Sequence, residues 1–221
     1  TILTPDQSIT FANDTHLFTD DDGTTYLFCG HGAYRPFDLL NCRPLGPWFP
    51  GVQDESADWC RAGIEGPFCI KRNGTYYVFL SSWTRGYEVG VATARHIGDP
   101  WQWQKKTPLF GARDKGMCDG YARRNDVGVR TENGPTPFCE IGHNSVFPGP
   151  DGRDWIAAHY HPRGTKIATN AYGSSWYEDS NPQLGFDPMW IDENGETATH
   201  CGSAAEQSVQ IPEAQWQRMY G

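Results

Sequence analysis

Short apolar and aromatic runs separated by turn residues make up most of the chain, and the 3.6-residue period of an amphipathic helix is nearly absent. Only "PEAQWQRMYG" at residues 212–221 is compatible with a short helix. Three segments share a stronger pattern of an apolar strand, an Asp-Gly or Asn-Gly turn and an aromatic strand: residues 16–30, 67–83 and 145–161. Because these dipeptides are strong hairpin signals, we predict three β-hairpins.

A further strand-like run follows each hairpin, at residues 36–43, 87–95 and 165–173. A partial fourth copy covers residues 186–199, whereas the polar, Gly-rich residues 110–138 interrupt the rhythm and predict a long loop. Repeated small antiparallel sheets are typical of propeller blades, and a β-sandwich with similar hairpins is the alternative. We expect an all-β, incomplete propeller over residues 1–200 and a tail at 200–221, with blades at about 9–50, 62–107 and 138–199.

The composition narrows the class of protein. Hydrophobic residues make up 38% of the 221 residues and aromatic residues 14%, with nine Trp, which is enough apolar area for a core. Aromatic side chains favour strands, and they also stack on flat ligands such as sugar rings. No run of about eighteen apolar residues occurs, so no membrane-spanning helix is expected. The net charge of −9 argues against a nucleic-acid partner.

Seven cysteines without a Cys-x-x-Cys pair favour disulfide bonds over a zinc ribbon. Two N-glycosylation sequons, at Asn13 and Asn73, agree with an oxidising compartment, so we expect a secreted, extracellular protein. The chain opens on "TILTPDQ" without a signal peptide, as a mature or excised piece would. Sequence does not fix which cysteines form disulfide bonds with each other. Their positions suggest three pairs, Cys29–Cys42, Cys60–Cys69 and Cys118–Cys139, and leave Cys201 unpaired.

Two carboxylates stand at the mouths of predicted hairpins. Glu65 occupies a Gly-X-Glu-Gly-Pro corner in "GIEGPFCIKRNGTYYVFLSSW", residues 63–83. It is either an ordinary turn residue or a proton donor held at a fixed angle. Asp14 precedes the first hairpin, where a strand-entry cap is the alternative. The run Asp20–Asp22 has no EF-hand spacing and reads as a solvated turn.

Four segments together carry a family resemblance: "NDTHLFTDDDGTTYLF" (13–28), "IEGPFCIKRNGTYYVFLSS" (64–82), "EIGHNSVFPGPDGRDWIAAHYH" (140–161) and "FDPMWIDENGETAT" (186–199). In order and rough spacing they resemble the five-bladed β-propeller glycoside hydrolases of family 43, which include arabinofuranosidases, arabinanases and xylosidases. The Glu-Gly-Pro and Gly-His-x-Ser segments are the specific part of the match. The resemblance covers residues 9–200.

The resemblance implies inverting hydrolysis of arabinofuranosyl, xylosyl or related glycosidic bonds by three carboxylates. By position, Glu65 matches the general acid and Asp14 the Asp that tunes the pKa of that acid. His143 matches a His near the propeller axis, which makes it a candidate for binding substrate and a calcium ion. A hydrogen-bonded core histidine is the alternative for His143. Trp83 is the candidate for stacking on a sugar ring.

The chain departs from the family in blade number, because the sequence predicts about three blades where the family has five. The general base belongs to the blades not found, so we expect this chain to lack it. Three explanations stay open: a C-terminal piece of a longer enzyme, a ring closed by a second copy or another chain, or a short relative that binds carbohydrate without cleaving it. A structural module without a sugar site is a further alternative. An open arc exposes sheet faces and edges, so we expect a partner in each case.

Overall fold

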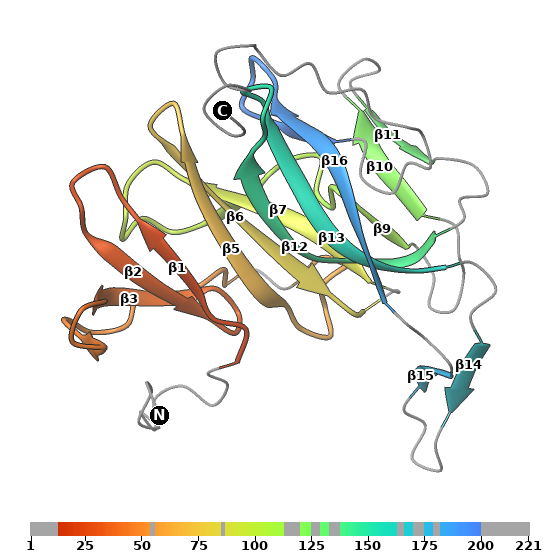
Figure 1. Ribbon diagram of the computed structural model, residues 1–221, viewed down its shortest axis with the longest axis horizontal. Coiled ribbons are helices and arrows are strands. Elements are labelled where there is room, and N and C mark those ends of the chain that lie inside the picture. The colour runs from red at the N-terminus through yellow and green to blue at the C-terminus, as the bar shows by residue number, and fades with distance from the viewer. Residues whose placement is uncertain are drawn as a thin grey trace, which may run out of the picture.

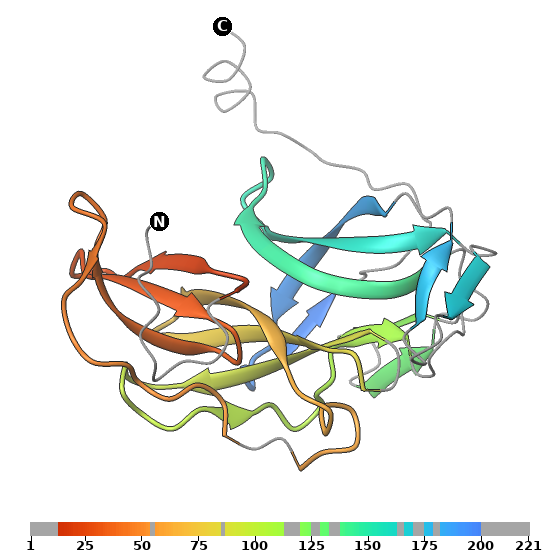
Figure 2. The ribbon, with the colours of Figure 1, turned by 90° about the horizontal axis from the view of Figure 1, so that it is seen from below.

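The computed structural model describes residues 13–53, 56–84, 87–112, 120–124, 129–132, 138–162, 166–169, 175–178 and 182–199. Throughout these residues the chain consists of antiparallel strands and turns without an α-helix, as the sequence predicts (Figure 1). Three main sheets follow one another in chain order (Figure 2). The same residues contain no helix that is long and apolar enough to span a membrane. The predicted helix at 212–221 lies outside them.

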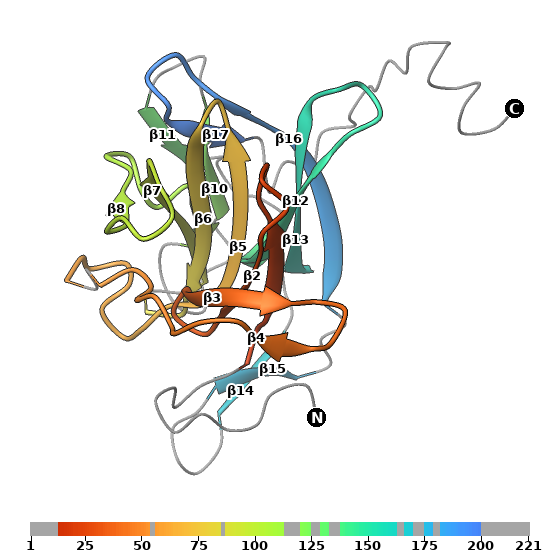
Figure 3. The same ribbon diagram turned by 90° about the vertical axis from the view of Figure 1, so that its left-hand side faces the viewer.

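The first sheet is a meander that Figure 3 shows nearest the viewer. Its strands, in spatial order, are β1 (His16–Thr19), β2 (Thr25–Cys29), β3 (Ala33–Asp38) and β4 (Arg43–Pro44). The predicted Asp-Gly turn joins β1 to β2, and the Gly23 N–H donates to the Asp20 carbonyl at 3.0 Å. Gly23 has φ +85°, a conformation that glycine adopts without strain.

The second sheet is longer than the sequence predicts. Its main strands are β5 (Glu65–Arg72), β6 (Thr75–Ser82) and β7 (Glu88–Ala94), and β7 also pairs with β8 (Gln102–Trp103). Residues 110–138, predicted as a loop, add three strands beyond β7: β9 (Phe110–Ala112), β10 (Gly120–Arg124) and β11 (Val129–Glu132). The loop prediction is therefore wrong in part, because strand pairing uses backbone groups and needs no apolar run.

The third sheet has the order β12 (Phe138–Pro148), β13 (Asp154–Pro162), β16 (Gln183–Ile191) and β17 (Thr197–Thr199). The run 165–173 was expected as its third strand. Its described part is β14 (Lys166–Thr169), which instead pairs with β15 (Ser175–Glu178) in a separate two-stranded sheet. Strand β16 takes that place beside β13. The partial fourth copy at 186–199 thus completes the third sheet.

Strand β6 separates two hydrophobic cores because its side chains alternate between them. Residues 76, 78 and 80 pack with Phe28 and Tyr34 of the first sheet. Residues 77 and 79 pack with Ile156 of the third sheet. A strand buried on both faces reads as an almost continuous apolar run, which explains the sequence "TYYVFLSS".

Two predicted disulfide pairs are not formed, since none of Cys29, Cys42, Cys60 and Cys69 is in a disulfide bond. Cys29 is fully buried at the end of β2, whereas Cys42 is exposed in the turn before β4. The thiols of Cys60 and Cys69 donate to different backbone carbonyls, those of Ala57 and Ile70. Burial raises the pKa of Cys29 to about 11. The pair Cys118–Cys139 and Cys201 lie outside the residues whose side chains are described.

Candidate active site

Glu65 is the first residue of β5 and lies opposite Ser81 of β6. The register slips between Glu65 and Phe68, so the Glu-Gly-Pro corner forms an irregularity at the mouth of the hairpin. Pro67 has no N–H for the ladder, and Gly66 has φ +62°. Bulges of this kind re-aim side chains and are frequent beside active sites. The corner thus sets the carboxylate of Glu65 apart from the regular pleat of the strand.

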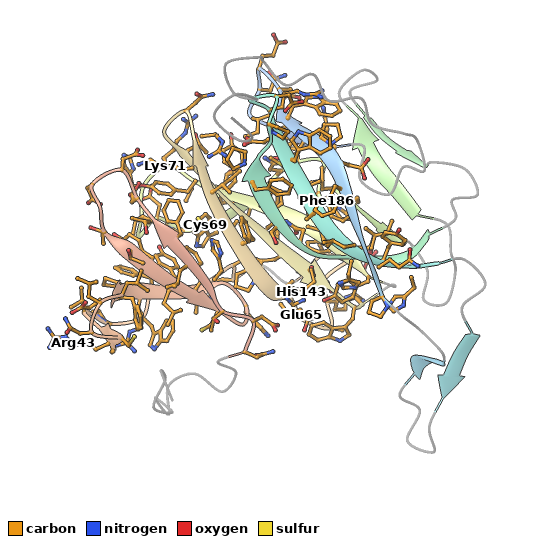
Figure 4. The ribbon with its side chains drawn as sticks, in the orientation of Figure 1. Arg43, Glu65, Cys69, Lys71, His143 and Phe186 are labelled. Carbon is orange, nitrogen blue, oxygen red and sulfur yellow. The ribbon has the colours of Figure 1, made fainter. Side chains whose placement is uncertain are left out.

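His143 packs against this corner from the third sheet (Figure 4). A Cβ at Gly66 would lie 3.1–3.2 Å from the imidazole of His143, so glycine is required both by space and by φ. His143 itself has φ +48° and lies in the irregular part of β12. Its backbone N–H donates to Ser81 Oγ at 2.9 Å. Ser81, the residue opposite Glu65, therefore joins the backbone of His143 to β6.

Tyr87, which the sequence analysis did not single out, joins these two side chains. Its phenol donates a short hydrogen bond to the Glu65 carboxylate and lies 3.3 Å from His143 Nδ1. Its ring lies on Gly142, where a Cβ would come within 2.2 Å of Tyr87 Cδ1. Both residues of the Gly-His pair therefore contact Tyr87. Gly142 leaves space for the ring of Tyr87, and His143 lies next to its hydroxyl.

A topological signal could have found Tyr87. Strand β5 begins at Glu65, β6 ends at Ser82 and β7 begins at Glu88. Because adjacent strands among the three are antiparallel, the start of β5, the end of β6 and the start of β7 lie at the same end of the sheet. The residue just before β7 must therefore lie near Glu65. This argument needs the strand boundaries, which the apolar pattern alone leaves uncertain by a few residues.

The electrostatics of this cluster favour neutral side chains around Glu65. Burial raises the pKa of Tyr87 well above its usual range, and the hydrogen bond to Glu65, the charge of Glu65 and the charge of Asp14 add to the effect. His159, whose ring centroid lies 5.1 Å from that of Tyr87, has its pKa lowered to about 4 by burial and then by the charges of His161 and His143. Near neutral pH the phenol therefore keeps its proton and His159 is uncharged.

Asp14 lies just before β1, half-buried, with φ +55°. Aspartate is one of the few residues that occupies this left-handed region readily. Asn13 Nδ2 donates to Asp14 Oδ2 at 3.1 Å. Since the charge of Asp14 raises the pKa of Tyr87, its carboxylate lies within electrostatic reach of the Glu65 partner. The first sheet thus brings a second carboxylate toward the same cluster.

Trp83 lies against the same corner. A Cβ at Gly63 would come 3.0 Å from Cη2 and Cζ2 of the indole, so the ring packs on the backbone two residues before Glu65. Its side chain is nevertheless 41% exposed. An aromatic ring that is fixed on one side and open on the other suits stacking on a sugar ring.

The described side chains do not fit a calcium site at His143. Among them, no group of three or more His, Cys, Asp or Glu residues is placed to hold a metal ion. The ring of His143 faces the phenol of Tyr87, and its centroid is 6.4 Å from that of His159. Calcium prefers six to eight oxygen ligands, which these rings do not supply. The calcium ion stays a prediction, and no step proposed below depends on it.

The chain matches the model of glycosyl hydrolases family 43 over residues 2–196. A beta-D-galactofuranosidase of Aspergillus niger is 31% identical over 157 residues, which are 69% of this chain and 37% of that protein. A thermostable family-43 glycoside hydrolase has a TM-score of 0.65 and 21% identity over 94% of this chain and 62% of its own. A xylan beta-1,4-xylosidase of Bacillus halodurans has a TM-score of 0.60 and 16% identity, with coverages of 91% and 36%.

These structural likenesses agree with the antiparallel sheets described above, and at such identities they concern the fold alone. The chain spans 37% of the length of the curated relative that it matches. The family match covers most of this chain and includes both the Glu-Gly-Pro and the Gly-His segments. The chain therefore belongs to glycosyl hydrolase family 43, with an all-β fold of the family's propeller type.

Proposed function

We propose that the protein containing this chain is an inverting glycoside hydrolase in which Glu65 is the general acid and Asp14 tunes it. The observation that carries the proposal is the fixed position of Glu65, on an irregular strand mouth and hydrogen-bonded to Tyr87 beside His143. A general acid must present its proton in one geometry, which a rigid corner provides. The charge of Asp14 reaches the same cluster, since it contributes to the raised pKa of Tyr87.

The chemistry requires one proton to reach the leaving oxygen as the bond between that oxygen and the anomeric carbon breaks. Glu65 supplies this proton. A water attacks the anomeric carbon from the opposite face, and a base carboxylate accepts the proton of that water. Inversion needs roughly 6.5–9.5 Å between the two carboxyl groups, which leaves room for the water. We assign no described residue to the base and infer that it comes from a further blade.

The outer face of the third sheet supports the presence of further blades. Leu184 and Phe186 of β16 are 59% and 50% exposed, and Phe186 meets Phe147 of β12 edge-to-face. Leu17 is 44% exposed on the first sheet. Exposed apolar side chains on sheet faces are an aggregation risk unless another surface covers them. We infer that blades from a longer chain, a second copy or a second chain cover these faces.

The substrate we propose is an oligo- or polysaccharide with arabinofuranosyl, xylosyl or related linkages. The Aspergillus niger relative is a galactofuranosidase and the Bacillus halodurans structure is a xylosidase, which supports furanosides and xylosides as the first compounds to test. Trp83 is the proposed stacking platform and His143 a proposed substrate contact. We also infer an extracellular location, supported by the exposure of both sequon residues, Asn13 and Asn73.

The test is turnover of aryl arabinofuranosides, xylosides and galactofuranosides by the native assembly, before and after Glu65→Gln. We expect Glu65→Gln to lower kcat by about 10²–10⁴-fold on substrates with poor leaving groups, because the proton donor is lost. The configuration of the first product, followed by NMR, should be opposite to that of the substrate. Unchanged activity of Glu65→Gln would remove the proposal.

A carbohydrate-binding propeller without catalysis is the second candidate. The exposed indole of Trp83 favours it, together with the lack of an assigned base in the described residues. It predicts saturable binding of arabino- or xylo-oligosaccharides by calorimetry without product release. Detection of product from the native assembly would exclude it.

A further inference from the structure

Tyr87 makes contacts that the roles of Glu65 and Asp14 do not explain. We propose that Tyr87 is the positioning residue of the acid: its phenol holds the Glu65 carboxyl in one orientation and serves that carboxyl in both of its protonation states. This inference rests on the proposed function of Glu65. Three observations carry it, namely the hydrogen bond to Glu65, the approach to His143 and the packing of the Tyr87 ring.

The ring of Tyr87 has little freedom to move. Gly142 lies directly beneath it, with the built Cβ position 2.2 and 2.5 Å from Cδ1 and Cε1. The ring of His159 lies at a centroid distance of 5.1 Å and a tilt of 42°. A phenol held in this way defines a fixed point in space, so a carboxyl bonded to it is also fixed. Catalytic groups need such support, because a displacement of about 1 Å can lower the rate by about 10²-fold.

The hydroxyl of Tyr87 has one hydrogen, and its polar neighbours include the Glu65 carboxyl, His143 Nδ1 and the Ser81 hydroxyl. When Glu65 is a carboxylate, the phenol donates to Glu65. When Glu65 carries a proton, Glu65 can donate to the phenol oxygen while the phenol donates to His143 Nδ1, which is an acceptor in the tautomer that carries its proton on Nε2. The hydrogen bond between Glu65 and Tyr87 is therefore kept before and after Glu65 gives up its proton, without a change of tautomer at His143. A lysine at this place would stabilise only the charged form.

The surroundings keep this hydroxyl in its neutral form. Burial, then the hydrogen bond to Glu65, raise the pKa of Tyr87 well above its usual range. Burial also leaves His159 uncharged near neutral pH. In the described residues no Lys or Arg forms an ion pair with Glu65. Tyr87 is thus the main polar partner of the acid in this part of the chain.

The test compares leaving groups in the native assembly. Protonation of the leaving oxygen matters for poor leaving groups, such as 4-methylphenol or a second sugar, and little for 2,4-dinitrophenol. We expect Tyr87→Phe to lower kcat about 10–100-fold on the poor leaving groups, and to change it less than about 3-fold on the dinitrophenyl glycoside. KM should change little in both cases. Loss of packing alone would lower kcat for all substrates alike and would overturn the inference.

Tyr76→Phe is the matched control, because its phenol also donates to a carboxylate, Asp20 Oδ2 at 2.5 Å, away from Glu65. Tyr76→Phe should leave kcat unchanged on both the poor leaving groups and the dinitrophenyl glycoside. If Tyr87→Phe unfolds at the assay temperature, 4-fluorophenylalanine at position 87 keeps the ring and its volume without a donor, and the same selective loss is expected. 4-Aminophenylalanine restores a donor and should recover most of the activity.

Glu65→Gln separates this inference from the proposed function. A selective loss on poor leaving groups in Glu65→Gln, together with a uniform change in Tyr87→Phe, would keep Glu65 as the acid and overturn the role of Tyr87. If Glu65→Gln shows no selective loss, or the unmutated assembly releases no product, the proposed function fails and the inference fails with it. Selective losses in both variants support both.

Discussion

Strand β5 carries a carboxylate contact at each end, and the two ends differ in how the negative charge is balanced (Figure 4). At the far end, Lys71 Nζ lies 2.6 Å from Asp20 Oδ1 and 2.9 Å from Asp21 Oδ2, and the phenol of Tyr76 also donates to Asp20. At the near end, where β5 begins, the phenol of Tyr87 donates a hydrogen bond to the carboxylate of Glu65. A tyrosine serves a carboxylate in both places, but a cation is present only at the far end among the described residues.

We propose that the difference separates a structural carboxylate, Asp20, from a chemical one, Glu65. Burial alone would raise the pKa of Asp20, but the hydrogen bonds from Lys71, Tyr76 and the Asp21 N–H outweigh it and hold that pKa below its usual value. Asp20 is therefore an anion near neutral pH, and its contact with Lys71 joins the first sheet to the second. The described partner of Glu65 is instead a phenol, which can donate a hydrogen bond to a carboxyl group or accept one from it.

The largest expected effect comes from replacing the carboxyl group at each end of β5 separately by an amide. Asp20→Asn should keep kcat within about 2-fold and lower the free energy of unfolding by about 1 kcal/mol, since solvent screens the ion pair with Lys71. Glu65→Gln should do the reverse, with activity lost by about 10²–10⁴-fold and stability kept. Kinetics and urea unfolding of both variants test the comparison. A similar loss of activity in both would contradict it.

Gly142→Ala should give the next largest effect, because the new Cβ overlaps the ring of Tyr87. We expect about 1–3 kcal/mol of destabilisation from overpacking and about a 10²-fold loss of kcat as the phenol leaves Glu65. Gly185→Ala on β16 is the control, since its Cβ would lie 3.2 Å from Tyr160 Cε1, so that the ring needs to shift only by a few tenths of an ångström, far less than Tyr87 in Gly142→Ala. Full activity of Gly142→Ala on poor leaving groups would contradict the proposed role of the Tyr87 ring.

The sequence predicts much of the fold and part of this comparison. The hairpin turns and the double-sided burial of β6 follow from local patterns of turn residues and apolar side chains. The sequence also singles out Glu65 and His143, because they lie in the Glu-Gly-Pro and Gly-His-x-Ser motifs. It misses Tyr87, whose role depends on a contact with Gly142 across two sheets. It also misses β9 to β11, whose polar, Gly-rich sequence carries little strand signal and whose pairing depends on the neighbouring β7.

The two ends should also differ in their response to acid. His159, near Glu65, has its pKa lowered from 6.5 to about 4. As the pH is lowered, His159 is therefore protonated in the unfolded state before it is protonated in the folded state. This difference lowers the free energy of unfolding as the pH drops from about 6.5 to 4. Asp20 has a lowered pKa, so its contribution is present above its ordinary value of 3.8 and is lost only as the pH falls below that value.

Urea unfolding at several pH values separates these two windows. His159→Gln should flatten the fall in stability between about pH 6.5 and 4, and Asp20→Asn should flatten the fall below about pH 4. Each variant is the control for the other, because Asp20 lies between β1 and β2 of the first sheet and His159 lies in β13 of the third. If the slope of stability against pH between 6.5 and 4 is unchanged in His159→Gln, the fall in stability in this range is not caused by His159.

The smallest expected effect concerns the second ion pair at the far end of β5. Arg72 Nε and Nη2 donate to Asp154 Oδ2 and Oδ1 at 2.8 and 2.6 Å, which joins the second sheet to the third as Lys71 joins it to the first. The geometry is bidentate, but the Arg72 side chain is 37% exposed, so solvent screens the pair. A double-mutant cycle of Arg72→Met and Asp154→Asn should give a coupling energy of about 0.5–1 kcal/mol, with kcat unchanged in every variant. A change in kcat would mean that the far end of β5 also positions Glu65, and the separation of a structural end from a chemical end would then fail.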